Sequence, residues 1–157
     1  MLIINKLKIL CEDTFFRGAF CGTVAGILKD FIDLLFSFSH IKELFFWSFA
    51  GVLAYGRLPE GAFMNLIGFV WEIIFSGFLG VLFALIASQI KTRHYLLMGI
   101  FYGSMAWFFI RAAVVCYKIE ELKTPNTPFR PLITWSLSML YGIIIAWMER
   151  KLSPKTS

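Results

Sequence analysis

The stretch GTVAGILKDFIDLLF, residues 22–36, has the composition of a membrane-spanning helix except for three charged side chains near its middle. Lys29, Asp30 and Asp33 interrupt an otherwise apolar run, and each charge in lipid costs at least about 2.5 kcal/mol on insertion scales. Charged residues in such segments face the interior of a helix bundle or a water-filled cavity. The stretch therefore predicts a bundle with a polar interior.

The composition of the whole chain also indicates a membrane protein. Of its 157 residues, 59% are hydrophobic and 16% are charged, whereas soluble proteins average about 25% charged residues. Crossing a bilayer takes roughly 20 apolar residues, so most of the chain is used by such segments. We predict a single polytopic transmembrane domain over residues 1–157.

We expect an all-α integral membrane protein, a compact bundle of four transmembrane helices. The apolar segments that predict them lie at about residues 15–38, 61–90, 95–117 and 129–148. A fifth apolar stretch at about residues 44–56 is broken by the sequence RLPEG and is short for a crossing. We therefore predict an interfacial or re-entrant helix there.

The distribution of lysine and arginine predicts the orientation. With four crossings and both termini cytoplasmic, the inner face holds eight of these residues and the outer face holds five. A fifth crossing at residues 44–56 would change this ratio to seven against six. The positive-inside rule therefore favours four crossings, and the short loops favour a bacterial plasma membrane.

Small residues recur at intervals of four in every predicted span. Helices in lipid associate where small side chains let their backbones approach closely. We predict helix contacts at the glycines of these stripes, which are Gly18, Gly22, Gly26, Gly80, Gly99, Gly103 and Gly142.

Charged and polar residues fall on the same helix faces as these small residues. At about 100° per residue, Lys29 and Asp33 share a face with the glycines of the first span, and Glu72 lies close to Ser76 on the second. The five charged residues away from the ends of the predicted spans lie in the outer half of the bundle. We predict an intramembrane polar cluster of Lys29, Asp30, Asp33, Asn65, Glu72 and Arg111.

The cluster holds three acids and two bases, a formal sum of −1. We expect Arg111 to pair with Glu72 or Asp33 and one acid to be left to bind a proton or a cation. In the alternative arrangement Lys29 pairs with Asp33 on its own helix, and Glu72 pairs with Arg111.

Two functions follow from this cluster. The first is an ion, proton or small-solute site in a helix bundle. The second is a non-catalytic accessory or structural membrane subunit whose charges form a packing network. We favour both over an enzyme, because the chain has no G-x-S-x-G, H-E-x-x-H or P-loop motif.

We expect no metal and no cofactor, because the three cysteines form no C-x-x-C pair and His40 and His94 lie on opposite sides of the membrane in this topology. The expected partners are the lipid bilayer and a second copy of the chain or a larger membrane complex. The net charge of +5 follows from membrane topology, so we expect no nucleic-acid partner.

Overall fold

The computed structural model describes residues 13–37, 45–90, 92–116 and 129–153, and it is all-helical over these ranges. The five helices are α2 (Thr14–Ser37), α3 (Phe46–Tyr55), α4 (Gly61–Gln89), α5 (Tyr95–Cys116) and α6 (Phe129–Leu152). The all-α prediction is confirmed. The predicted element boundaries agree with the helices to within a few residues, except that α6 extends beyond residue 148. Residues 38, 44 and 117, His40 and both chain termini lie outside the described residues.

Among the described residues, three segments are long and apolar enough to cross a membrane by length and composition: Gly61–Gln89, Tyr95–Val114 and Pro131–Leu152. α2 is similar in length, but it contains Arg17, Lys29, Asp30 and Asp33, and every 18-residue window in it includes at least three of them. By the same criteria of length and composition, α2 is therefore not counted among the candidate spans. α3 has ten residues, which is too short for a crossing.

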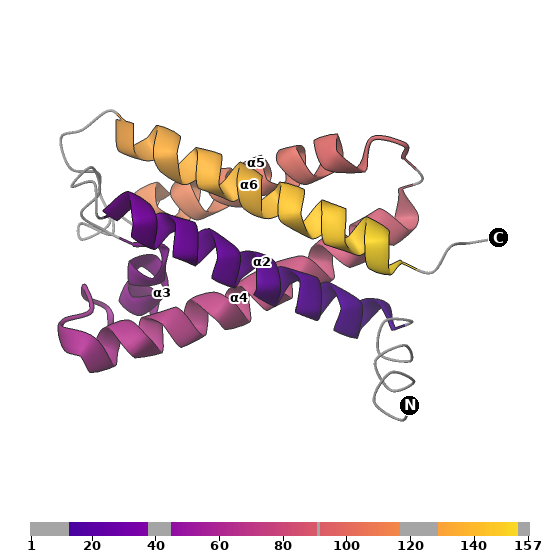
Figure 1. Cartoon of the computed structure of the whole chain (residues 1–157). Helices are drawn as coiled ribbons and strands as arrows, with labels where there is room; N and C mark the ends of the chain where they lie inside the picture. Colours follow the sequence, from indigo (N-terminus) through magenta and orange to yellow (C-terminus); the bar gives the residue numbers. More distant parts are fainter. Residues whose placement is uncertain (1–12, 38–44, 91, 117–128, 154–157) are drawn as a thin grey trace, which may run out of the picture.

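The four long helices lie side by side, as Figure 1 shows. α2 runs antiparallel to α4, because Gly18 lies beside Ala84 and Lys29 contacts Glu72. α5 runs antiparallel to α6 and forms its main contact with that helix. The start of α2 and the end of α6 therefore lie at one end of the bundle, and α3 lies at the other, packed against α4 (Figure 1).

Glycines let two helix pairs touch through their backbones. A Cβ atom on Gly22 would overlap the Ser76 carbonyl oxygen and the backbone of Gly80, where α2 meets α4. A Cβ atom on Gly99 would overlap the Gly142 carbonyl, where α5 meets α6. The structure places all seven glycines singled out in the sequence in buried positions at these two contacts.

A third close contact joins α3 to α4. A Cβ atom on Gly68 would lie 2.7 Å from the Trp47 carbonyl oxygen and 3.3 Å from the Gly51 Cα atom. Neither Gly51 nor Gly68 is among the glycines predicted to form helix contacts, because α3 was not among the predicted spans. This contact fixes the short helix on the first half of α4.

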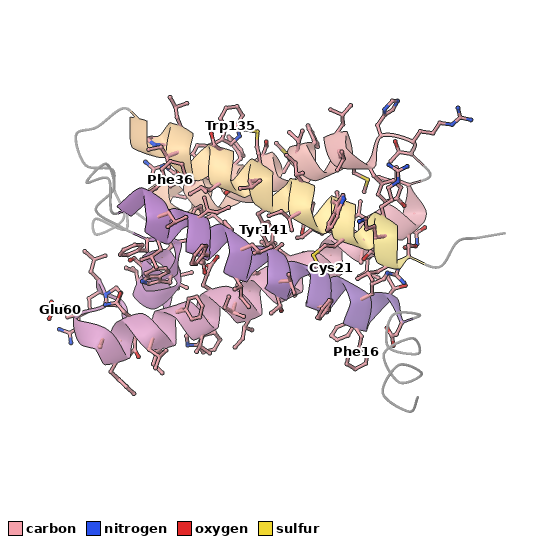
Figure 2. The ribbon with its side chains drawn as sticks, viewed as in Figure 1. Phe16, Cys21, Phe36, Glu60, Trp135 and Tyr141 are labelled. Atoms are coloured by element: carbon pink, nitrogen blue, oxygen red, sulfur yellow. The ribbon has the colours of Figure 1, made fainter. Side chains whose placement is uncertain are left out.

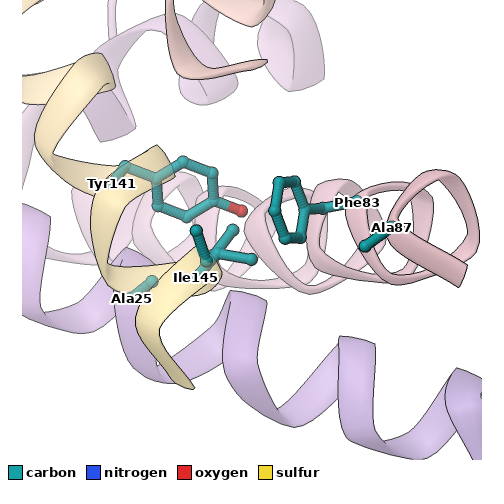
Figure 3. Packing of buried hydrophobic residues seen from close by; sticks show 6 residues of the cluster. Ala25, Phe83, Ala87, Tyr141 and Ile145 are labelled. Carbon is teal, nitrogen blue, oxygen red and sulfur yellow. The ribbon is translucent and has the colours of Figure 1, made fainter. Parts of the chain in front are cut away.

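The buried apolar core lies where α2, α4 and α6 meet. Figure 3 shows Phe83, Tyr141 and Ile145 packed together, with Ala25 and Ala87 beside them. Tyr102 of α5 closes this cluster and makes an edge-to-face contact with Phe83 at 5.2 Å between ring centroids. The core thus joins α2, α4, α5 and α6 near the middle of the bundle.

Large apolar side chains cover the outside of the bundle. Phe101 and Phe109 of α5 and Phe63 of α4 are each about two-thirds exposed or more (67%, 68% and 72%), and Phe16 and Trp135 also point outwards (Figure 2). An apolar exterior around a core that contains charges is typical of a protein whose surroundings are lipid.

Candidate functional site

Lys29 links three helices inside the bundle. Its side chain is 4% exposed, and its ammonium group forms ion pairs with Glu72 of α4 and, at 3.1 Å, with Asp30 Oδ1. The same nitrogen lies 3.8 Å from the ring centroid of Phe46 in α3, a cation–π contact. A buried ammonium needs such partners because it has lost its hydration.

Asp33 binds the start of α3 rather than Lys29 in the contacts described. The backbone N–H of Phe46 donates a hydrogen bond of 3.0 Å to Asp33 Oδ2. The first N–H groups of a helix have no partner within it, and the residue before α3, Phe45, supplies no side-chain cap. The carboxylate of α2 therefore satisfies this N–H group and also lies at the positive end of the α3 dipole.

Asp30 is the least satisfied acid of the described residues. It is 2% exposed, and neither of its carboxylate oxygens accepts a hydrogen bond in the part of the chain that the structure describes. Its contact with Lys29 is close enough for an ion pair but does not have hydrogen-bond geometry. Asp30 is thus held by charge alone.

Glu72 and Ser76 connect this cluster to α6. The Ser76 hydroxyl donates to Glu72 Oε1 at 3.4 Å, one turn away on α4. The Tyr141 hydroxyl donates to the Ser76 carbonyl oxygen at 2.5 Å. Through these bonds α6 is held to the part of α4 that carries the acid.

Asn65 belongs to a different contact. Its Oδ1 atom accepts a hydrogen bond of 3.2 Å from Trp47 Nε1, and its amide nitrogen donates to the Gly61 carbonyl oxygen at 2.9 Å. The residue lies two helical turns before Glu72 on α4. The structure therefore brings Lys29, Asp30, Asp33 and Glu72 together and gives Asn65 a role in holding α3.

A cavity of about 350 Å³ adjoins the charged cluster. Side chains from α3, α4, α5 and α6 surround it, and Lys29 of α2 also lines it. Its charged lining residues are Lys29, Glu72 and Arg111, and its uncharged polar ones are Ser76, Thr134, Ser138 and Tyr141. Arg111 thus contributes to the same space as Glu72 from the opposite helix pair.

A hydrogen bond between α5 and α6 forms one wall of the cavity. Trp107 Nε1 donates to Thr134 Oγ1 at 3.0 Å, and the Thr134 hydroxyl donates to the Pro131 carbonyl oxygen at 3.1 Å. The indole is therefore fixed in orientation, with its ring against the cavity.

A second buried ion pair, which the sequence pattern did not predict, lies at the opposite end of the bundle. Arg17 Nε lies 2.7 Å from Glu149 Oε1, and their side chains are only 5% and 3% exposed. The predicted topology counts Arg17 among the eight lysine and arginine residues of the inner face and ends the last span at about residue 148. The sequence does indicate that Glu149 faces inwards, because it lies within about 20° of Gly142 on the helical wheel of α6.

The charges of the cluster do not balance. Lys29 and Arg111 carry two positive charges and Asp30, Asp33 and Glu72 carry three negative ones, so the formal sum is −1. Among the described residues no three His, Cys, Asp or Glu side chains lie close enough to hold a metal ion.

Comparisons of the chain with protein families, curated proteins and solved structures found no match.

Proposed function

We propose that this chain is a membrane-spanning bundle of four helices that binds a small solute in the cavity between α3, α4, α5 and α6. The observation that carries the proposal is that the cavity reaches the buried charges of Lys29 and Glu72 and is also lined by Arg111. A volume of about 350 Å³ lies in the range of small-molecule sites, which are mostly apolar with a few polar groups that orient the ligand.

The burial of its charges supports α2 as the fourth crossing. Arg17, Lys29, Asp30 and Asp33 are each at most 5% exposed, so none faces the surroundings. The opposite face of α2 presents Phe20, Ile27, Phe31 and Leu35, which are all at least 46% exposed. A helix with this distribution meets lipid with apolar side chains only, as a transmembrane helix in a bundle does.

The ion pairs support a second function, that of a structural or accessory membrane subunit. Lys29–Glu72 joins α2 to α4, and Arg17–Glu149 joins α2 to α6 near the other end. Such pairs fix the register of neighbouring helices, which a purely structural protein also needs. The two functions differ in whether the cavity is open to small molecules.

Cysteine labelling tests the solute site. In a variant without Cys11, Cys21 and Cys116, a cysteine in place of Ser138 lies in the polar lining of the cavity. The thiolate is the reactive form, and a polar site that small molecules reach favours it. We expect N-ethylmaleimide to label Ser138→Cys in the reconstituted full chain, and we expect the cavity-filling change Ala106→Phe to slow this labelling.

Ser48→Cys is the matched control. Ser48 is buried at 4% exposure on α3 and lines neither this cavity nor the second pocket, which lies between α2 and α4. Equally slow labelling of Ser138→Cys and Ser48→Cys would mean that the cavity is closed, and the solute site would then be rejected in favour of the structural role.

A further inference from the structure

Three buried charged residues form one group in which the acids outnumber the base. The Lys29 ammonium group pairs with Glu72 of α4 and, at 3.1 Å, with Asp30 of its own helix. All three residues are at most 7% exposed. Among the described residues, no other ion pair involves any of them. One ammonium group therefore faces two carboxylates, and the group carries a formal charge of −1.

The neighbouring helices do not supply a second cation to this group. Asp33, the next charged residue of α2, is itself an acid and binds the backbone at the start of α3. Tyr141 of α6 offers only a neutral hydroxyl near the group. Arg111 of α5 lines the cavity of the proposed solute site, but in the described part of the chain it forms no ion pair with either acid of the group. One of the two carboxylates is therefore not offset by an ion pair of its own.

Asp30 and Glu72 differ in the hydrogen bonds that they accept. Glu72 Oε1 accepts hydrogen bonds from the Lys29 ammonium group and from the Ser76 hydroxyl. Neither carboxylate oxygen of Asp30 accepts any in the part of the chain that the structure describes. Burial disfavours the charged form of a carboxyl group, and hydrogen bonds to its oxygens favour that form. Of the two acids, Asp30 is therefore the one at which a proton binds.

Asp30 also lines the second pocket, which lies between α2 and α4 beside the start of α3. Among the described residues that line this pocket, Asp30 is the charged one. Phe31 and Leu66 line it as well, and they are 60% and 58% exposed. The pocket therefore opens toward the outside of the bundle, where the surroundings of a membrane-spanning protein are lipid.

We infer that Asp30 is a proton-binding site, which holds one proton in the folded protein near neutral pH and is reached through the pocket between α2 and α4. The bound proton neutralises the surplus charge, so that Lys29 and Glu72 remain as a balanced ion pair. This site is separate from the proposed solute site and does not depend on it, because Asp30 does not line that cavity.

Infrared spectroscopy tests the presence of the proton. A neutral carboxyl group has a C=O stretching band that an ionised carboxylate lacks. We expect the full chain, reconstituted in phosphatidylcholine vesicles, to show such a band near neutral pH, and we expect Asp30→Asn to remove it. This variant should fold, because Lys29 and Glu72 keep each other as partners. A parent protein without the band, or a band that Asp30→Asn leaves unchanged, would overturn the inference.

A hydrophobic carbodiimide tests which carboxyl group holds the proton. Dicyclohexylcarbodiimide dissolves in lipid and reacts with a protonated carboxyl group, whose proton moves to a nitrogen of the reagent while its oxygen adds to the central carbon. Rearrangement leaves an acylurea on the side chain, which mass spectrometry of peptides locates. We expect labelling at Asp30 that declines as the pH rises, because only the protonated form reacts. Glu149, which is buried and paired with Arg17, should stay unlabelled.

Glu72→Gln separates proton binding from access of the reagent. The change removes one of the two carboxylates and leaves Lys29 to balance Asp30 alone, so Asp30 should then be ionised. We expect the labelling of Asp30 near neutral pH to fall by about tenfold or more. Glu149→Gln, at the other end of the bundle, should leave it unchanged. Equal labelling of Asp30 in the parent and in Glu72→Gln would mean that the unequal charges do not bind the proton, and the inference would be rejected.

Two cavity-filling changes test the route to Asp30. Leu66→Trp narrows the pocket between α2 and α4 and should slow the labelling, whereas Ala106→Phe in the other cavity should not. A carboxyl band without labelling at Asp30, or labelling that Leu66→Trp does not slow, would overturn this route. Failure of the labelling at Ser138→Cys would reject the solute site and leave the proton site standing.

Discussion

Lys29 makes contacts with three helices in the cluster of buried charges around Glu72. Its ammonium group contacts Glu72, Asp30 and the ring of Phe46, and so joins α2, α4 and α3 at one point. Taking charges out of water costs several kcal/mol per ion, which a well-placed pair recovers only in part. Removing one partner therefore does more damage than removing both.

A double-mutant cycle tests this pairing. We expect Lys29→Met to lower the free energy of unfolding by about 3–5 kcal/mol, since it leaves Glu72 and Asp30 buried without their cation. Adding Glu72→Gln should restore part of that loss, which gives a non-additive cycle. The measurement is unfolding of the reconstituted protein in mixed detergent and SDS micelles.

Glu149→Gln is the control partner for this cycle. Glu149 pairs with Arg17, near the other end of the bundle. Lys29→Met and Glu149→Gln should therefore add within about 0.5 kcal/mol. Additive behaviour of Lys29→Met with Glu72→Gln would mean that the two side chains do not meet in the membrane.

At the scale of the helix, α2 and α4 form a contact that depends on missing side chains. Gly22 and Gly80 face each other, and a Cβ atom on either would overlap the backbone of the partner helix. Helix association in lipid relies on such close packing, because burial against lipid gains little. The contact also sets the register that brings Lys29 opposite Glu72.

Gly22→Ala should therefore separate α2 from α4 and lower the free energy of unfolding by about 1–3 kcal/mol. Gly77→Ala is a matched change on the same interface, and there the nearest atom to a new Cβ is the Thr23 hydroxyl at 3.0 Å, the end of a side chain. The same unfolding assay compares the two variants. Equal stability would contradict the backbone contact at Gly22.

At the scale of the whole molecule, the alternating directions of the helices place the start of α2 and the end of α6 at the same end of the bundle. The start of α2 and the end of α6 lie at one end of the bundle, and Glu60 lies at the other, as Figure 2 shows. The excess of lysine and arginine, eight against five, predicts that the first of these ends is cytoplasmic.

Labelling from one side of the membrane tests this orientation. In the cysteine-free background, a membrane-impermeant maleimide added to intact cells should label Glu60→Cys and leave Ser153→Cys unlabelled until the membrane is opened. Asp13→Cys, close to the start of α2, should behave like Ser153→Cys. Labelling of Ser153→Cys in sealed cells would contradict the proposed four crossings or their orientation.

The sequence by itself determined the helical class, the positions of the helices and the residues that share each helix face. These are local properties, because segment length, hydropathy and the rotation of about 100° per residue belong to the chain before it packs. For this reason residues 44–56 were expected to form a short helix that does not cross, and α3 occupies Phe46–Tyr55. The burial of Lys29, Asp33 and Glu72 was also expected from their positions beside glycine and serine.

Only the tertiary structure decided which partner each charge has. Lys29 pairs with Glu72, Asp33 binds the backbone of Phe46, and Arg17 pairs with Glu149. These contacts depend on how far one helix is shifted and rotated against the next, and one residue of shift moves a side chain by about 1.5 Å and 100°. The cavity has the same origin, because side chains from α3, α4, α5 and α6 surround it, and the sequence of one helix does not determine how the others are placed around it.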